Sequence, residues 1–259
     1  MKLVTGSCGF IGRNLLARLD GDVACYDTIN NTLPTIHEIL ELVEWENVTE
    51  IFHLGAISDT TCRDVELLHE HNVRFSIELF KRAIENQIPV TYASSGSVYG
   101  HTCEGRQYRI NPLNYYAMTK ATVDMWVEDN IERFSLVRGM RFFNVYGENE
   151  GSKGDQASPY YKFKKQARET GVIKIFDNSD STYRDFIRVD DVVTTMIECK
   201  RESGIYDVGT ADPKTFTQVA EEVSAETGAS IERINFPISL QGKYQYFTRA
   251  QYAFTELLT

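Results

Sequence analysis

Apolar runs alternate with amphipathic stretches along the first 150 residues of the chain. The runs with the composition of buried strands are Lys2–Thr5, Val23–Asp27, Ile51–Gly55, Pro89–Ser94 and Leu136–Val145. Between them, apolar residues recur at helical spacing over Ile11–Leu19, Ile36–Glu44, Arg63–Asn86 and Tyr115–Arg133. This alternation predicts right-handed βαβ units in an α/β fold with a Rossmann-type, doubly wound parallel sheet. Ligands of such a sheet bind at the carboxyl ends of its strands.

The pattern changes after Tyr146-Gly147. The polar, glycine-containing segment Glu148–Gly154 predicts a loop. Further helices and strands are predicted over Pro159–Thr170, Val172–Phe176, Arg184–Val189, Asp190–Lys200, Ile205–Val208, Thr215–Thr227 and Ile231–Phe236. We therefore expect a dinucleotide-binding Rossmann domain over residues 1–150 and a smaller C-terminal substrate-binding lobe over 151–259, with some elements of the two parts intermixed.

Charge and cysteine content narrow the class of protein. The 259 residues include 27 Lys+Arg and 37 Asp+Glu, and a net charge of −10 disfavours nucleic acid and anionic membranes as partners. No run of 18 apolar residues or signal-peptide pattern predicts a membrane segment or export. Five scattered cysteines without C-x-x-C spacing are typical of reduced thiols, and the histidines form no metal-ligand pattern. We expect a cytoplasmic protein without a metal.

A glycine-rich turn follows the first predicted strand and opens the first predicted helix. Residues 6–12 read Gly-Ser-Cys-Gly-Phe-Ile-Gly. Gly6, Gly9 and Gly12 allow a tight turn whose backbone N–H groups approach a pyrophosphate at a helix start. Phe10 and Ile11 would bury this helix against the sheet. Taken alone, the turn is also compatible with a purely structural loop.

Asp27 lies at the end of the second predicted strand, 21 residues after Gly6. A carboxylate there can accept hydrogen bonds from the adenosine ribose hydroxyls and would repel a 2′-phosphate. No Lys or Arg occurs between Arg18 and Arg63 to offset its charge. The sequence therefore favours NAD as cofactor, with NADP as the alternative.

Three residues have the types and spacing of a catalytic set. Ser95 follows the fourth strand, and Tyr116 and Lys120 open a predicted helix. Because Tyr116 and Lys120 are four residues apart, they share one helix face. An ammonium near a phenol lowers a pKa that is ordinarily about 10, so Tyr116 could take a proton from a substrate hydroxyl while Ser95 hydrogen-bonds the same oxygen.

The spacing Tyr-x-x-x-Lys occurs twice more, at Tyr160/Lys164 and Tyr161/Lys165. Both pairs fall in the predicted second lobe and are interpreted as surface residues of a helix. Only the pair at residues 116 and 120 follows a strand-end serine in the parallel sheet, where a cofactor ring would lie.

Together these residues resemble the extended short-chain dehydrogenase/reductase family of nucleotide-sugar enzymes, from residue 1 to about residue 250. Within that family the chain is most similar to the ADP-L-glycero-D-manno-heptose 6-epimerases, as a short variant. The segments that carry this likeness are Ile57–Thr61, Arg141–Gly147, Glu150–Gly154, Arg184–Phe186 and Gly242–Gln245.

The resemblance implies epimerisation by transient oxidation to a ketone and return of the hydride to the opposite face. It implies that Tyr116 and Lys153 are two acid/base groups, and that the protein is a homo-oligomer paired through the helices over Arg63–Asn86 and Tyr115–Arg133. The implied cofactor contacts are Phe10, Ile11, Asp27, Thr28, Leu54, Gly55, Ala56, Ser58, Asn72, Lys120 and Val145. The implied substrate contacts are Asn144, Asp155, Lys162, Phe176, Asp177, Asn178, Ser179, Arg184 and Tyr244.

The chain also departs from the pattern of the heptose epimerases. Only 23 residues separate Asp27 from Ile51, where the resemblance implies a longer stretch with an extra strand beside the adenine. Thr35–Trp45 predicts a single helix there, so an edge strand is expected to be missing. Asp155 adds a negative charge near the expected diphosphate, and the family's final helix has no counterpart before Thr259.

Three other functions are weighed against this one. A 4,6-dehydratase is disfavoured, because its Asp-Glu pair is replaced here by Gly96-Ser97 after Ser95. A 4-epimerase or reductase of another nucleotide sugar would use the same Ser95, Tyr116 and Lys120. A non-catalytic dinucleotide-binding sensor is the alternative from another class, although it would not need all three residues.

Overall fold

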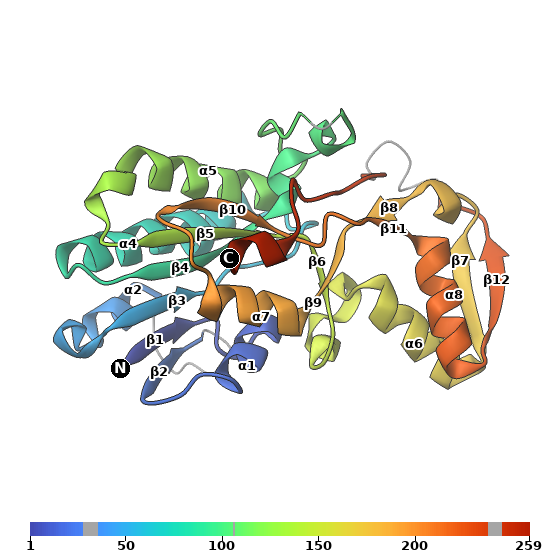
Figure 1. Cartoon of the computed structure of the whole chain (residues 1–259), viewed down its shortest axis with the longest axis horizontal. Coiled ribbons are helices and arrows are strands. Elements are labelled where there is room, and N and C mark those ends of the chain that lie inside the picture. The colour runs from blue at the N-terminus through green and yellow to red at the C-terminus, as the bar shows by residue number, and fades with distance from the viewer. Residues whose placement is uncertain (28–35, 106, 238–244) are drawn as a thin grey trace.

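The computed structural model describes residues 1–27, 36–105, 107–237 and 245–259. Its centre is a parallel six-stranded sheet in the order β10-β5-β4-β3-β1-β2 (Figure 1). The strands are β1 (Lys2–Thr5), β2 (Val23–Tyr26), β3 (Glu50–His53), β4 (Val90–Ser95), β5 (Val137–Phe142) and β10 (Gly204–Val208). The order reverses between β1 and β3, where such sheets bind their ligands. The predicted Rossmann-type α/β fold is confirmed.

Helices cover both faces of this sheet (Figure 1). One face carries α2 (Ile36–Glu41), α4 (Phe75–Glu85) and α5 (Tyr115–Asn130), and the other carries α1 (Phe10–Leu16) and α7 (Val189–Glu198). Two separate apolar cores result. The first is formed by residues such as Leu79, Phe80, Val90 and Val127, and the second by Leu15, Phe52, Met140 and Val192.

The long helical pattern over Arg63–Asn86 is not one regular α-helix. It consists of α3 (Val65–Leu68), a π-helical stretch over His69–Arg74, and α4. The first helix begins at Val65 because the side chain of Asp64 accepts a hydrogen bond from the Leu67 N–H at 2.9 Å. π-Helical turns widen the helix locally and often occur at functional sites.

The last predicted strand of the first part is divided in two. Instead of one strand over Leu136–Val145, β5 ends at Phe142 and β6 covers Asn144–Tyr146. β6 leaves the large sheet and pairs with β9 (Phe186–Arg188) in a parallel two-stranded sheet. The Phe143 N–H between the two strands donates to the Val208 carbonyl at 3.1 Å, which turns the chain out of the sheet.

A second predicted strand, Arg184–Val189, is also divided, into β8 (Tyr183–Arg184) and β9. The residue between them, Asp185, is fully buried, and its carboxylate accepts hydrogen bonds from the backbone N–H groups of Thr210, Ala211 and Ala250. Burying a carboxylate is costly without such donors, so the chain turns at this residue to reach them.

The smaller lobe lies to the right of the large sheet in Figure 1. It packs α6 (Pro159–Thr170) and α8 (Phe216–Thr227) on β7 (Val172–Phe176), which pairs with β12 (Ser230–Ile234). Its core includes Phe163, Ile173, Ile175, Val219 and Val223. β11 (Lys214–Thr215) pairs with β8, while α7 and β10, also from residues after 150, belong to the layers of the large sheet.

Within the described residues, β2 is the outermost strand at one edge of the large sheet. Across the described part of the chain, no strand pairs with the free side of β2. The predicted helix beyond it ends at Glu41 and is followed by a 3₁₀ turn over Trp45–Asn47, so it is shorter than expected. None of the helices in the described ranges is long and apolar enough to cross a bilayer.

Candidate active site

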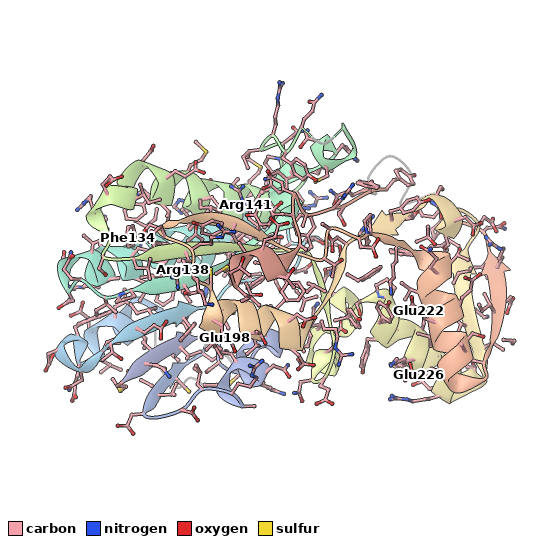
Figure 2. The ribbon with its side chains drawn as sticks, viewed as in Figure 1. Phe134, Arg138, Arg141, Glu198, Glu222 and Glu226 are labelled. Atoms are coloured by element: carbon pink, nitrogen blue, oxygen red, sulfur yellow. The ribbon has the colours of Figure 1, made fainter. Side chains whose placement is uncertain are left out.

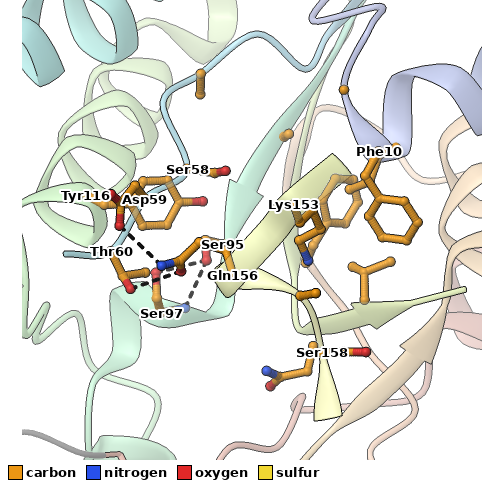
Figure 3. Close-up of a pocket in the computed structure, with 18 of the residues that line it drawn as sticks. Phe10, Ser58, Asp59, Thr60, Ser95, Ser97, Tyr116, Lys153, Gln156 and Ser158 are labelled. Atoms are coloured by element: carbon orange, nitrogen blue, oxygen red, sulfur yellow. Dashed lines mark hydrogen bonds between the residues drawn. The ribbon is translucent and has the colours of Figure 1, made fainter. Parts of the chain in front are cut away.

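One cavity of about 1270 Å³ opens at the carboxyl ends of β1, β3 and β4 and reaches α6, β7 and β8 of the smaller lobe. Its walls include the glycine turn, Ser95, Tyr116, Lys120 and Lys153. Figure 3 labels Ser95, Tyr116 and Lys153 among the residues that line it. The structure therefore brings all four predicted catalytic residues to one space, together with the predicted cofactor residues other than Asn72 and Thr28.

The glycine turn cannot carry side chains at two of its positions. Gly6 has a φ angle of +72°, and a Cβ there would lie 2.6 Å from the Gly55 nitrogen. A Cβ on Gly12 would lie 2.2 Å from the Gly6 carbonyl oxygen. The residues Gly6, Gly9, Phe10, Ile11 and Gly12 all line the cavity. Because the turn keeps its backbone close to this space, it fits the diphosphate of a dinucleotide.

Asp27 lines the same cavity just beyond β2. Its Oδ2 accepts a hydrogen bond from the Cys8 backbone N–H at 2.8 Å, so the carboxylate orders the glycine turn as well as facing the space for a ribose. Arg13 of α1 also lines the cavity and was not singled out from the sequence. The predicted neighbour Thr28 lies outside the described residues.

The side chain of Asn72 is hydrogen-bonded to the backbone of the loop that follows β3. The Asn72 Oδ1 accepts from the Ile57 N–H at 2.8 Å, and its Nδ2 donates to the Ile57 carbonyl at 3.0 Å. Asn72 is 1% exposed and does not line the cavity, so it positions the loop instead of facing a cofactor directly. The predicted cofactor residues that do line the cavity here are Leu54, Gly55, Ala56 and Ser58.

His53, at the end of β3, belongs to the core. Its Nδ1 lies 2.6 Å from the Thr5 hydroxyl and its Nε2 lies 2.8 Å from the Ser76 hydroxyl. Burial lowers the pKa of His53 to about 3, so the ring is neutral. In the described ranges, no group of three or more His, Cys, Asp or Glu side chains is arranged to hold a metal ion.

Ser95 is the last residue of β4. Its hydroxyl accepts hydrogen bonds from the Ser97 N–H at 3.2 Å and from the Ser97 hydroxyl at 2.8 Å. A hydrogen bond also joins the side chains of Ser95 and Tyr116. Ser97 therefore shares this wall of the cavity, although the sequence offered no reason to select it over the other serines of the turn.

Tyr116 and Lys120 reach the cavity from successive turns of α5. The helix begins at Tyr115 because the Asn114 side chain accepts a hydrogen bond from the Ala117 N–H at 2.9 Å. The Lys120 ammonium donates to the Ala93 carbonyl at 2.8 Å, and burial lowers the pKa of Lys120 to about 8.

The pKa of the Tyr116 phenol is raised, not lowered as the Tyr-Lys spacing predicts. Burial disfavours the phenolate more strongly than the hydrogen bond with Ser95 favours it, and the nearby Asp124 carboxylate disfavours it further. The helical spacing thus places the pair correctly but does not determine the ionisation of the phenol.

Asp124 is buried one turn beyond Lys120 on α5. Its carboxylate accepts hydrogen bonds from the Tyr92 hydroxyl, the Ser94 hydroxyl and the Arg141 Nε, at 2.9, 2.9 and 2.8 Å. Arg141, labelled in Figure 2, also donates to the Tyr99 hydroxyl at 2.8 Å. These contacts join α5 to β4 and β5, next to the predicted catalytic residues Tyr116 and Lys120.

Lys153 lies in a 3₁₀ segment over Glu150–Gln156, where the polar composition predicts a loop. The buried Glu150 carboxylate accepts hydrogen bonds from the Ser158 N–H and hydroxyl, which fixes the segment to the start of α6. The Lys153 Nζ lies 3.6 Å from Glu150 Oε1 and 5.1 Å from the centroid of the Phe10 ring. Burial lowers the pKa of Lys153 and the Glu150 carboxylate raises it in part.

Some of the predicted substrate residues line the cavity and others do not. Those that line the cavity are Asn144, Lys162, Phe176, Ser179 and Arg184, together with the predicted cofactor residue Val145. Asp177 and Asn178 do not line it. Tyr244 and the side chain of Asp155 lie outside the described part of the structure.

Arg184 and Ser179 offer polar groups on the lobe side. The Arg184 guanidinium donates to the backbone carbonyls of Tyr183 and Gln245 and lies 5.6 Å from the centroid of the Phe216 ring. The hydroxyl of Ser179 is buried and has no hydrogen-bond partner in the described structure. A buried hydroxyl without a partner is costly, so a ligand donor or acceptor would be favoured there.

The second Tyr-x-x-x-Lys pair differs from its prediction. Tyr160 is not a surface residue: it is buried, stacks on Tyr146 with 4.1 Å between ring centroids, and donates to Glu222 at 2.6 Å. Lys164 pairs with Glu226, and both glutamates are labelled on α8 in Figure 2. The spacing at these positions therefore serves the packing of α6 on α8.

The fold and the site together define a Rossmann-type, dinucleotide-dependent enzyme. More narrowly, the chain belongs to the NAD dependent epimerase/dehydratase family, to which residues 2–209 match. The cofactor of this enzyme is accordingly NAD or its phosphorylated form.

Solved structures of nucleotide-sugar enzymes share this fold. ADP-L-glycero-D-manno-heptose-6-epimerase from Helicobacter pylori is 23% identical, with a TM-score of 0.77 over 99% of this chain and 94% of that one. UDP-N-acetylglucosamine 4-epimerase from Methanobrevibacter ruminantium is 21% identical, with a TM-score of 0.84 over 100% and 91%. UDP-glucose 4-epimerase from Thermotoga maritima is 21% identical, with a TM-score of 0.83 over 97% and 89%.

Proposed function

We propose that the protein is an epimerase of a nucleoside-diphosphate sugar, of the heptose 6-epimerase type. One carbinol carbon is oxidised transiently to a ketone and receives the hydride back on its opposite face. The observation that supports this most is that Tyr116 and Lys153, from different segments, line one cavity together with Ser95 and Lys120. Return of hydride to either face calls for a proton donor on each side of the ketone.

The residues around the glycine turn would hold the dinucleotide. Gly6, Gly9 and Gly12 leave room for its diphosphate, and Asp27 would accept hydrogen bonds from the adenosine ribose. NAD, when bound, supplies the hydride acceptance and return on which the reaction depends. Lys120, held by the Ala93 carbonyl, would face its nicotinamide end.

Tyr116 is the proposed base for the substrate hydroxyl. Ser95 hydrogen-bonds the same oxygen and fixes its position. Burial raises the pKa of Tyr116. An ammonium on Lys120, one turn along α5, would favour the phenolate during the reaction. The Tyr116 phenol then returns the proton when the alkoxide forms on its side of the ketone.

Lys153 is the proposed second acid/base group. Its amine points into the cavity between the lobe and the glycine turn (Figure 3). Burial lowers its pKa, so the Lys153 ammonium is a stronger acid, and a better proton donor, than the ammonium of an exposed lysine. Glu150 holds the side chain in place at 3.6 Å.

The smaller lobe is the proposed site of the nucleotide. Arg184 and Lys162 supply positive charge for a diphosphate, and Phe176 supplies an aromatic wall for a base. Ser179 adds a hydroxyl that lacks a protein partner within the described structure. The proposed substrate is ADP-heptose or a close relative.

We also propose that the protein is a cytoplasmic homo-oligomer. Large apolar side chains are exposed on α3 and α5, including Val65, Leu67, Met118 and Met125, which are 50%, 42%, 49% and 58% exposed. The two helices contact each other, and a second copy that packs on both would cover these exposed side chains, which are here called the apolar surface on α3 and α5.

The test is a screen of ADP-, GDP-, UDP-, CDP- and dTDP-sugars with NAD, followed by proton NMR. Inversion at C6 of an ADP-heptose supports the proposal. Inversion at C4, or net reduction, of another nucleotide sugar would assign the alternative activity of the same residues. Tight NAD binding without turnover of any sugar would favour a non-catalytic sensor.

A further inference from the structure

A side-chain bridge spans two segments that face each other across the cavity. Gln156, at the end of the segment that carries Lys153, donates from its Nε2 to Asp59 Oδ1 at 3.2 Å. The Thr60 hydroxyl donates to the Gln156 Oε1 at 3.4 Å. The amide is therefore bonded on both sides by the loop that follows β3 (Figure 3).

The bridge lies in the part of the site where the reacting sugar would bind. Asp59, Thr60 and Gln156 are half-buried and line the same cavity as Ser95 and Tyr116. Ser97 and Ser58 complete this polar end with two further hydroxyls. A sugar whose hydroxyl reaches Tyr116 would therefore place its other substituents against Asp59 and Gln156.

Asp59 gives this end of the cavity a negative charge. The Thr61 N–H and hydroxyl both donate to its Oδ1 at 2.7 Å, which keeps the pKa of Asp59 below its usual value and the group ionised. Within the described residues, no ion pair includes Asp59. The lysines of this region are already engaged, Lys153 by Glu150 and Lys120 by the Ala93 carbonyl.

We propose that Asp59 and Gln156 determine the class of sugar, accepting neutral or amino sugars and rejecting sugars that carry a carboxylate. This inference rests on the proposed nucleotide-sugar activity and narrows its substrate. An ionised carboxylate accepts hydrogen bonds from hydroxyl and ammonium groups, whereas it repels a second carboxylate. The Gln156 amide can exchange its bonds to Asp59 and Thr60 for bonds to a sugar hydroxyl, so it contributes directional recognition without charge.

Paired ligands test the inference directly. UDP-glucose and UDP-glucuronate differ only in having a hydroxymethyl or a carboxylate group. The pair ADP-glucose and ADP-glucuronate repeats the comparison with a purine base in place of a pyrimidine. Calorimetry with the NAD-loaded full chain should show the glucose form binding at least about tenfold tighter. UDP-glucosamine should bind at least as tightly as UDP-glucose.

The decisive variant is Asp59→Asn, which keeps the Oδ1 acceptor for Thr61 and removes the charge. The affinity gap between the glucose and glucuronate forms should close by about tenfold or more. Glu66→Gln is the matched control, because it removes one exposed negative charge on α3 outside the cavity and should leave the gap unchanged.

Equal affinity for the two forms in the wild-type protein, or a gap that survives Asp59→Asn, would overturn the role of Asp59 while leaving the nucleotide-sugar activity standing. Absence of binding by every nucleotide sugar would overturn both the proposed function and this inference. Thermal unfolding of the NAD-loaded Asp59→Asn protein checks that the variant is folded. Gln156→Glu is a second test variant: it adds a negative charge beside Asp59, so the affinity gap between the glucose and glucuronate forms should widen.

Discussion

The Nε of Arg141 lies 2.8 Å from the Oδ2 of Asp124, in a place where the Asp124 side chain is 1% exposed. Asp124 is four residues beyond Lys120, so this ion pair lies one helical turn along α5 from Lys120, on the same face of the helix. Two hydroxyls, from Tyr92 and Ser94, complete the hydrogen bonds of the carboxylate. The ion pair therefore joins α5 to β5, and the two hydroxyls join it to β4, the strand that ends at Ser95.

Replacing Arg141 by Met should destabilise the protein strongly. It would leave the Asp124 carboxylate buried without its cation, which typically costs about 3–5 kcal/mol. Urea unfolding followed by circular dichroism measures the change in the free energy of unfolding. Arg82→Met is the matched control, because its partner Glu41 is exposed and its loss should cost about 1 kcal/mol or less. Equal losses in the two variants would contradict the structural importance of the buried pair.

Lys120 should make stability depend on pH in the alkaline range. Burial lowers its pKa from 10.5 to about 8, so between these pH values the unfolded chain binds more protons than the folded one. The free energy of unfolding should therefore rise with pH across this window, relative to that of Lys120→Met. Urea unfolding at several pH values gives both slopes. Lys200→Met changes an exposed lysine, so its free energy of unfolding should vary with pH as that of the wild-type protein does. If the free energy of unfolding of Lys120→Met also varied with pH as in the wild type, the effect of burial on Lys120 would be refuted.

Lys153→Ala should abolish epimerisation and spare simple oxidation. Loss of an acid/base group typically lowers the rate by about 10²–10⁴-fold. Proton NMR would follow the epimerisation, and NADH absorbance would follow the oxidation of an aldehyde-bearing substrate analogue. The control Lys165→Ala removes an exposed lysine of α6 that pairs with Glu169. Unchanged epimerisation in Lys153→Ala would remove this residue from the mechanism.

NAD should bind more tightly than NADP. Asp27 lines the cavity and carries a negative charge that a 2′-phosphate would meet. Calorimetry on the purified protein should give a Kd for NADP at least about tenfold higher, and Asp27→Asn should narrow the difference. Tighter binding of NADP by the wild-type protein would contradict this prediction and would show that a cation, such as Arg13, outweighs the charge of Asp27 at this end of the cavity.

The apolar surface on α3 and α5 should hold two copies of the chain together. The double variant Val65→Glu and Met118→Glu places charges on that surface and should lower the molar mass measured by light scattering towards that of one chain. Ile231→Glu on β12 is the control, since this residue is exposed on a different part of the molecule. A wild-type mass of one chain at micromolar concentration would exclude the proposed pairing.

The sequence predicted the parts of the fold that depend on local patterns. Alternating apolar runs predicted five strands of the sheet, while the sixth, β10, was predicted as a strand of the C-terminal part. The spacing of Tyr116 and Lys120 placed them on one helix face. The breaks at Phe143 and Asp185 were not predicted, because each depends on partners far along the chain, Val208 in one case and Ala250 in the other.

The candidate site shows the same division. The glycine turn and Ser95 follow directly from short motifs, whereas the contacts of Asp124 with Arg141 and of Asp59 with Gln156 join residues from separate elements. Asn72 was expected to contact the cofactor, whereas its amide is hydrogen-bonded to the Ile57 backbone, a contact between separate segments that no short motif indicates.

The buried Glu150 carboxylate has a mechanical consequence for the reaction cycle. It binds Ser158, the residue that caps α6, and it also holds Lys153 at 3.6 Å. Any movement of α6 on binding of the proposed nucleotide would therefore be transmitted to the amine through Glu150. For the proposed substrate, binding energy gained at the nucleotide end would in this way align the amine at the sugar end, so a sugar without its nucleotide should lose turnover rate as well as affinity.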